Sequence, residues 1–165
     1  MQFTQRRPPQ GQKITAIHHQ PRRALERLQL GKDDIQFDKI RVYYNHPDFI
    51  GTMVTKTNEG LAKLPESDAP VHLVFTAHSI PKSMAAGSDY EVQLKEASRL
   101  VAEEAGVPDW SLVYQSRSGP PQIPWLEPDV CDYIDTLAEQ GVKRIAIIPI
   151  GFISDHMEVL FDLDN

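Results

Sequence analysis

Short apolar runs recur along the chain from residue 39 onward. Three of them, at 71–77, 111–116 and 144–150, are rich in aliphatic residues and have the length of buried strands. A fourth run, KIRVYYN at 39–45, has the same character and ends at an Asn-His-Pro turn. The pattern therefore predicts four short strands.

Helical spacing of apolar residues separates these runs. It predicts three helices, over 48–63, 89–105 and 127–140. Gly106 and Gly141 follow the second and third at the positions where a helix commonly stops. Residues 22–30 favour a further short helix, and Ser154 is a candidate cap for a final one. Strands that alternate with helices predict an α/β fold, with a four-stranded parallel sheet flanked by helices on both faces.

The composition narrows the class of protein. A length of 165 residues suits one domain, and we interpret 1–21, which contains several prolines, as a flexible leader before a domain at 22–165. A net charge of -6 argues against a nucleic-acid partner, and the apolar runs are too short for a transmembrane segment. One cysteine, Cys131, excludes an internal disulfide and predicts a reducing, cytoplasmic compartment.

Two polar clusters follow predicted strands, at the edge where open parallel sheets place their sites. His78 comes directly after the run at 71–77, and Asp155, His156 and Glu158 follow the run at 144–150. Histidine suits proton transfer near neutral pH, and glutamate is a base or an oxygen ligand. Glu158 and Asp162 share a helix face, which fits either a cation-binding row or a solvated surface. The residues alone leave metal binding, acid/base catalysis and a structural role open.

Three motifs in order carry a family resemblance: FTAHSIP (75–81), YQSRSGPPQIPWLEPDV (114–130) and IPIGFISDHMEVLFDLD (148–164). Together they resemble the signature segments of the ferrochelatases, most closely the actinobacterial type that works on coproporphyrin. The resemblance covers roughly residues 22–165 and implies the Rossmann-like second domain of a two-domain fold, truncated at its C-terminus. It implies insertion of ferrous iron, as substrate, into a porphyrin, with release of two pyrrole protons. The porphyrin is either coproporphyrin III or protoporphyrin IX.

The resemblance also implies a role for individual residues. His78 and Glu158 would be the catalytic pair, and Asp162 would join them in holding the metal. Trp125 and Phe152 would contact the porphyrin. Three residues would orient the catalytic pair: Ser154, Asp155 and His156. Many actinobacterial relatives bind a [2Fe-2S] cluster, but one cysteine, Cys131, cannot supply four ligands, so the chain does not support a cluster.

Other functions remain open at this point. One alternative is a non-catalytic half-domain that binds porphyrin or iron and needs a separate N-terminal half. A second alternative is a cobalt or nickel chelatase of the same superfamily, although the loop at 121–130 favours the iron-porphyrin branch. A nucleotide-binding domain is disfavoured, because no glycine-rich phosphate loop follows any predicted strand.

Overall fold

The computed structural model describes residues 14–15, 37–38, 41–154 and 159, which belong to two compact units divided after Val42. In the first unit, strand β1 (Ile14–Thr15) pairs in parallel with β2 (Phe37–Asp38), and Ile14 lies opposite Phe37. The predicted helix at 22–30 and nearly all of the predicted leader at 1–21 lie outside the described residues.

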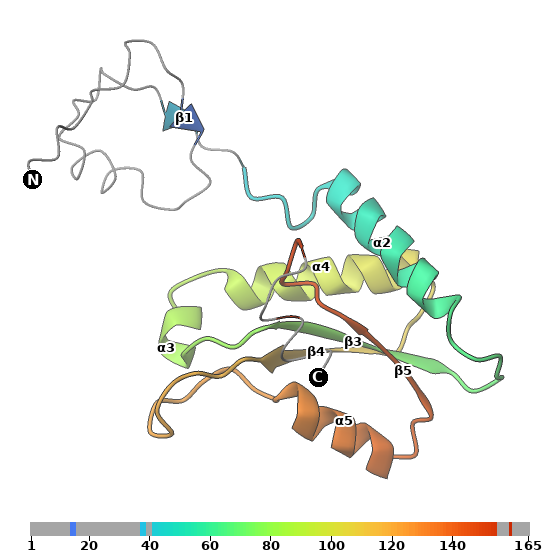
Figure 1. Ribbon diagram of the computed structural model, residues 1–165. Helices are drawn as coiled ribbons and strands as arrows, with labels where there is room; N and C mark the ends of the chain where they lie inside the picture. The colour runs from blue at the N-terminus through green and yellow to red at the C-terminus, as the bar shows by residue number, and fades with distance from the viewer. Residues whose placement is uncertain (1–13, 16–36, 39–40, 155–158, 160–165) are drawn as a thin grey trace, which may run out of the picture. The chain divides into compact units, whose positions relative to one another are not determined.

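The second unit is built on a parallel sheet of three strands (Figure 1). Strand β3 (Val71–His78) lies in the middle, between β4 (Trp110–Gln115) and β5 (Arg144–Ile148). The registers place His78 opposite Gln115 and Phe75 opposite Ile148. The prediction of a parallel α/β sheet is thus confirmed.

The predicted number of four strands is wrong for this sheet, because the candidate at 39–45 does not join it. Residues 41–46 contain no strand, and two of the apolar side chains that suggested one, Val42 and Tyr43, are 41% and 42% exposed. The chain instead prepares the next helix: the Nδ1 atom of His46 accepts a hydrogen bond from the backbone N–H of Asp48 at 3.2 Å, and Pro47 occupies the first turn.

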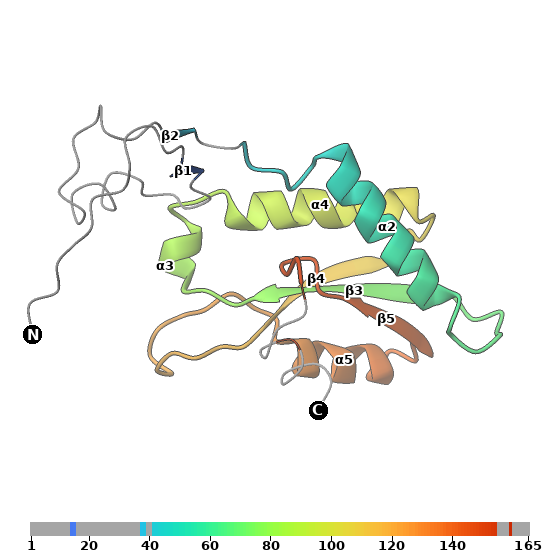
Figure 2. The same ribbon diagram turned by 45° about the horizontal axis from the view of Figure 1, so that its top comes forward.

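Helices cover both faces of the sheet, as predicted (Figure 2). Helices α2 (Pro47–Leu61) and α4 (Tyr90–Glu104) lie on one face, and α5 (Val130–Glu139) lies on the other. A short helix that the sequence pattern did not predict, α3 (Lys82–Ala85), follows β3. Gly106 and Gly141 end α4 and α5 with φ of 71° and 80°, the left-handed conformation that glycine adopts readily.

Alternation along β3 decides which side chains meet which helices. Leu73, Phe75 and Ala77 belong to the larger core cluster, together with residues of α2 and α4. Val74 belongs to the smaller cluster, which contains Val130 and Leu137 of α5. Thr76 and His78 therefore share the α5 face of the sheet with Val74. Among the described helices, none is long and apolar enough to cross a membrane.

Candidate active site

His78 is the last residue of β3 and lies at the carboxyl edge of the sheet. It is half-buried, and its Nδ1 atom is inaccessible to solvent. The hydroxyl of Tyr90, at the start of α4, donates a hydrogen bond to the backbone oxygen of His78 at 2.9 Å. The next backbone N–H, that of Ser79, donates to the oxygen of Gln115 at 2.8 Å. Two neighbouring elements therefore fix the backbone that carries the imidazole.

The proline-rich segment after β4 returns to this backbone and closes over it. Ser79 is 2% exposed, and its hydroxyl donates to the oxygen of Leu126 at 2.9 Å. The N–H of Leu126 donates to the oxygen of Ile80 at 3.0 Å, and the N–H of Lys82 donates to the oxygen of Pro124 at 2.9 Å. Three hydrogen bonds thus join segments more than 40 positions apart and hold the chain immediately after His78.

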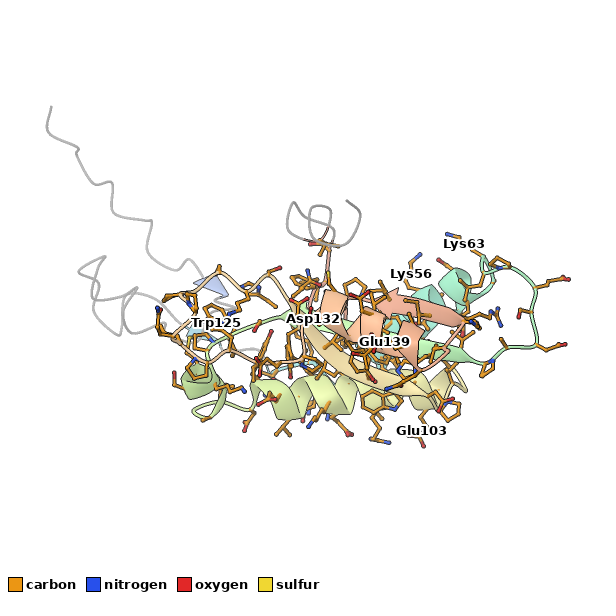
Figure 3. All side chains as sticks on the ribbon, turned by 90° about the horizontal axis from the view of Figure 1, so that it is seen from below. Lys56, Lys63, Glu103, Trp125, Asp132 and Glu139 are labelled. Carbon is orange, nitrogen blue, oxygen red and sulfur yellow. The ribbon has the colours of Figure 1, made fainter. Side chains whose placement is uncertain are left out.

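Trp125 is buried within this segment. Figure 3 shows it near α3, far from Lys56 and Lys63 of α2. Its side chain is 9% exposed, and its indole N–H has no hydrogen-bond acceptor among the described residues. A Cβ atom added to Gly119 would lie 2.5 Å from Cε2 and 2.6 Å from Nε1 of Trp125, so only glycine fits against the ring. The predicted porphyrin contact of Trp125 would need the Gly119 segment to move away from that side of the indole.

A second glycine, Gly151, allows the segment after β5 to pack closely against the end of β3. The N–H of Gly151 donates to the oxygen of Thr76 at 3.1 Å. A Cβ atom at this position would lie 2.8 Å from Cβ and 2.9 Å from Cα of Ala77, one residue before His78. The two predicted polar clusters therefore begin at neighbouring strand ends.

Phe152 and Ser154 follow Gly151. Phe152 is half-buried and Ser154 is exposed, and both line a cavity of about 510 Å³ together with Val159 and residues of α2 and β5. The remaining members of the predicted site lie outside the described residues: Asp155, His156, Glu158 and Asp162. The structure thus gives a geometry for His78 but not for its predicted carboxylate partner.

Metal ligands can be assessed only within the described part of the chain. There, no group of three or more His, Cys, Asp or Glu side chains could hold a metal ion, and His78 is the one predicted ligand with a described position. Cys131 is exposed at the start of α5, and partial burial together with Asp129, Asp132 and Asp135 raises the pKa of its thiol. This environment disfavours the thiolate that metal binding requires.

Two polar side chains on the α5 face were not predicted as site residues. Thr76 and Gln115 are 0% and 1% exposed, and neither side chain has a hydrogen-bond partner within the described residues. A polar residue at the carboxyl end of an apolar strand, as in SLVYQS, is a signal that would have drawn attention to Gln115. Its position opposite His78 depends on strand register, which the sequence pattern does not give.

Comparisons with known proteins agree with the resemblance in the motifs. The family model described as Ferrochelatase matches residues 10–165. The chain is 50% identical over 140 residues to a ferrochelatase of Rhodopirellula baltica, covering 84% of this chain and 40% of that protein. It is 48% identical over 149 residues to the coproporphyrin III ferrochelatase of Corynebacterium glutamicum, covering 86% and 40% of the two chains. The chain thus spans about 40% of the length of these relatives.

Proposed function

The chain belongs to the ferrochelatase family, and from this premise we propose that it supplies the His78 side of a site that inserts ferrous iron into a porphyrin. The observation that carries the proposal is the position of His78. Its backbone oxygen accepts a hydrogen bond from Tyr90 at the carboxyl edge of β3. The next residue, Ser79, is tied to the segment after β4 by its hydrogen bond to Leu126. An imidazole carried on a firmly held backbone at a strand end is suited to act on a substrate bound against that edge.

The reaction makes two demands on such a site. Two pyrrole N–H protons must leave the porphyrin, and the iron must exchange its waters for the four pyrrole nitrogens. The imidazole of His78 can accept a proton, and its neutral form can also ligate Fe(II). We assign Glu158 as its acidic partner and Asp162 as a further oxygen ligand for the incoming metal. Ser154, Asp155 and His156 would then orient the pair.

The porphyrin itself would lie against the same edge, with Trp125 and Phe152 as its aromatic contacts. We favour coproporphyrin III over protoporphyrin IX as the substrate, because several relatives at 44–48% identity bear the name coproporphyrin III ferrochelatase. A cytoplasmic location is consistent with the single cysteine, Cys131, since the cytosol keeps thiols reduced.

A chimera tests this proposal. The chain would replace the matching segment of the Corynebacterium glutamicum relative, so that the remainder of the family's chain is present. With coproporphyrin III and anaerobic Fe(II), the chimera should quench free-porphyrin fluorescence and give the absorbance of the iron porphyrin. His78→Ala in the chimera should slow this change at least about 100-fold, the usual lower contribution of a general base. Near-normal turnover without His78, or none with it, would contradict the proposal.

A second candidate function is supported by the open edge of the sheet. Within the described residues, β5 pairs with β3 alone, and Ile147 on β5 is 39% exposed. Ile153, at the end of the adjoining cavity, is 73% exposed. Unpaired strand edges with apolar side chains favour association with another segment. The alternative is therefore a half-domain that binds iron or porphyrin and becomes active only with the rest of the family's chain.

Activity of the 165-residue chain by itself separates these two candidates. Formation of iron porphyrin by the chain alone would favour the enzyme. Binding of coproporphyrin III without metallation, followed by metallation once the remaining family segment is added as a separate polypeptide, would favour the half-domain.

A further inference from the structure

Two buried polar side chains near His78 form no side-chain hydrogen bond to any described residue. Thr76 Oγ1 and both amide atoms of Gln115, Nε2 and Oε1, have no hydrogen-bond partner in the described part of the chain. A buried polar group left in this state lowers the stability of the fold. Buried polar groups in native proteins are nearly always paired, so an exception calls for a functional explanation.

The position of Gln115 suggests what it serves. Gln115 lies directly opposite His78 in the parallel register of β3 and β4, and neighbouring strands are about 4.8 Å apart. Gln115 also alternates with Tyr114, which packs in the larger core, so its side chain shares the α5 face with His78. The contacts of α5 with the sheet include Val74 and Val113, which lie further from the carboxyl edge than Gln115. The side chain of Gln115 thus lies on the same face as the imidazole, in the neighbouring strand, and is itself buried.

The two nitrogens of His78 differ in their surroundings. Nδ1 is buried, and we take Nε2 as the ring nitrogen that meets a ligand at the edge of the sheet. A cation bound at Nε2 draws electron density from the ring and makes the N–H at Nδ1 a stronger donor. Metal-bound histidines almost always give this second N–H to a carboxylate, a carbonyl or a water. The amide oxygen of Gln115 is a carbonyl on the residue opposite His78, and no described residue donates a hydrogen bond to it.

We propose that Gln115 is a positioning residue for His78: its Oε1 accepts the Nδ1–H of His78 when Nε2 holds the incoming divalent metal. The inference rests on the proposed function, which assigns His78 to metal handling. Thr76, two residues before His78, adds a further buried hydroxyl to the same face. Hydrogen bonds of this kind commonly tighten when the substrate binds.

Two substitutions of Gln115 separate positioning from a purely structural role. Gln115→Leu keeps nearly the same volume and removes an amide that no described residue pairs with, so stability should be unchanged or higher while metal affinity falls about 10–100-fold. Gln115→Glu keeps an oxygen acceptor, so affinity should stay within about threefold of the unsubstituted chain, although a buried carboxylate lowers stability. A purely structural role of Gln115 predicts the opposite order of metal affinities: the stable Gln115→Leu variant would bind the metal normally.

The test is a titration of the 165-residue chain with Co(II), followed by its visible absorption and by calorimetry. His78→Ala identifies the part of the binding that depends on the imidazole. Ser98→Ala is the matched control, because Ser98 is also 0% exposed and its hydroxyl also lacks a partner among the described residues, but it lies on α4, across the sheet. Weakened binding in Gln115→Leu, retained binding in Gln115→Glu and no change in Ser98→Ala are the expected results.

Unchanged Co(II) affinity in Gln115→Leu would overturn the inference, as would Co(II) binding that does not respond to His78→Ala. This result is independent of porphyrin chemistry. If Co(II) binding depends on His78 and Gln115 but the chimera fails to metallate coproporphyrin III, the inference stands and the proposed function fails. If the chimera metallates the porphyrin while Gln115→Leu binds Co(II) normally, the proposed function stands and the role inferred for Gln115 fails.

Discussion

Replacing Gly151 with alanine should destabilise the chain at the point where β5 meets β3. The new methyl group would lie 2.8 Å from Cβ and 2.9 Å from Cα of Ala77. Carbon atoms in contact prefer separations of about 3.5–4.0 Å, so the two strand ends must move apart by several tenths of an ångström. Ala77 is 0% exposed in the centre of the sheet, and its Cα belongs to the backbone, so neither atom can rotate away.

The expected magnitude follows from overpacking in other cores, where an added methylene costs about 1–3 kcal/mol. The hydrogen bond from the N–H of Gly151 to the oxygen of Thr76, now 3.1 Å, would also lengthen and lose part of about 1 kcal/mol. A total of about 2 kcal/mol should lower the melting temperature by roughly 4–8 °C for a chain of 165 residues.

Thermal unfolding followed by circular dichroism measures this effect, and Gly51→Ala provides the matched control. A Cβ atom at Gly51 meets nothing within 4 Å, and the residue is exposed within α2, so the same substitution should stabilise by roughly 0.5–1 kcal/mol. Combining Gly151→Ala with Ala77→Gly should cost less than the sum of the two single changes, since the nearest clashing atom is gone. A Gly151→Ala chain as stable as the original would refute the close approach of the strand ends.

Three further predictions concern side chains around the sheet. Ser79→Ala should lower the free energy of unfolding by about 1–3 kcal/mol in urea, because the buried oxygen of Leu126 loses its donor; a change below about 0.5 kcal/mol would argue against that bond. Burial lowers the pKa of His72, so the unfolded chain binds more protons between the folded value and 6.5, and the melting temperature should fall as the pH drops through this window. His72→Gln should reduce this fall of the melting temperature with decreasing pH. If the pH dependence is the same in the variant, other groups cause it. Cys131, whose pKa is raised by partial burial and by Asp129, should react with iodoacetamide at pH 8 more slowly than a cysteine in an unstructured peptide, and equal rates would contradict the shift.

Local sequence signals were sufficient for the types of most elements in the second unit. Apolar runs identified β3, β4 and β5, because parallel strands covered on both faces are apolar almost throughout. Gly106 and Gly141 marked the ends of α4 and α5, because glycine adopts positive φ at little cost.

The error at 39–45 shows where this reasoning stops. An apolar run predicts a strand only if a partner is available, and strand pairing depends on contacts that periodicity does not contain. Val42 and Tyr43 have the composition of a strand, yet they are exposed in the turn that leads into α2. Whether such a run forms a strand of the sheet depends on its burial in the folded chain, which apolar character alone does not give.

In the candidate site, too, the sequence predicted what depends on local residues and missed what depends on tertiary contacts. His78 could be predicted, because the apolar run and the histidine at its end are both visible in the local sequence. Gln115, Gly151 and the burial of Trp125 beneath Gly119 could not, because each follows from register or from the path of a loop. The roles assigned to Trp125 and to the residues after Ser154 stay predictions.

The geometry around His78 also indicates which experiment carries most weight. A porphyrin is a flat macrocycle, and a site that encloses it needs two walls, within a pocket of about 300–1,000 Å³ for a ligand of this class. The cavity next to Ser79 has a volume of about 260 Å³, and its lining includes charged side chains such as Arg117, Glu127 and Asp132. The described residues in this region thus form one firm wall, which Ser79, Tyr90 and Gly151 hold in place. Because the chain spans about 40% of the length of its relatives, the chimera is the assay in which a second wall is present. If His78 works as proposed, its substitution should therefore matter most in the chimera, where the porphyrin is enclosed and the imidazole can act on it.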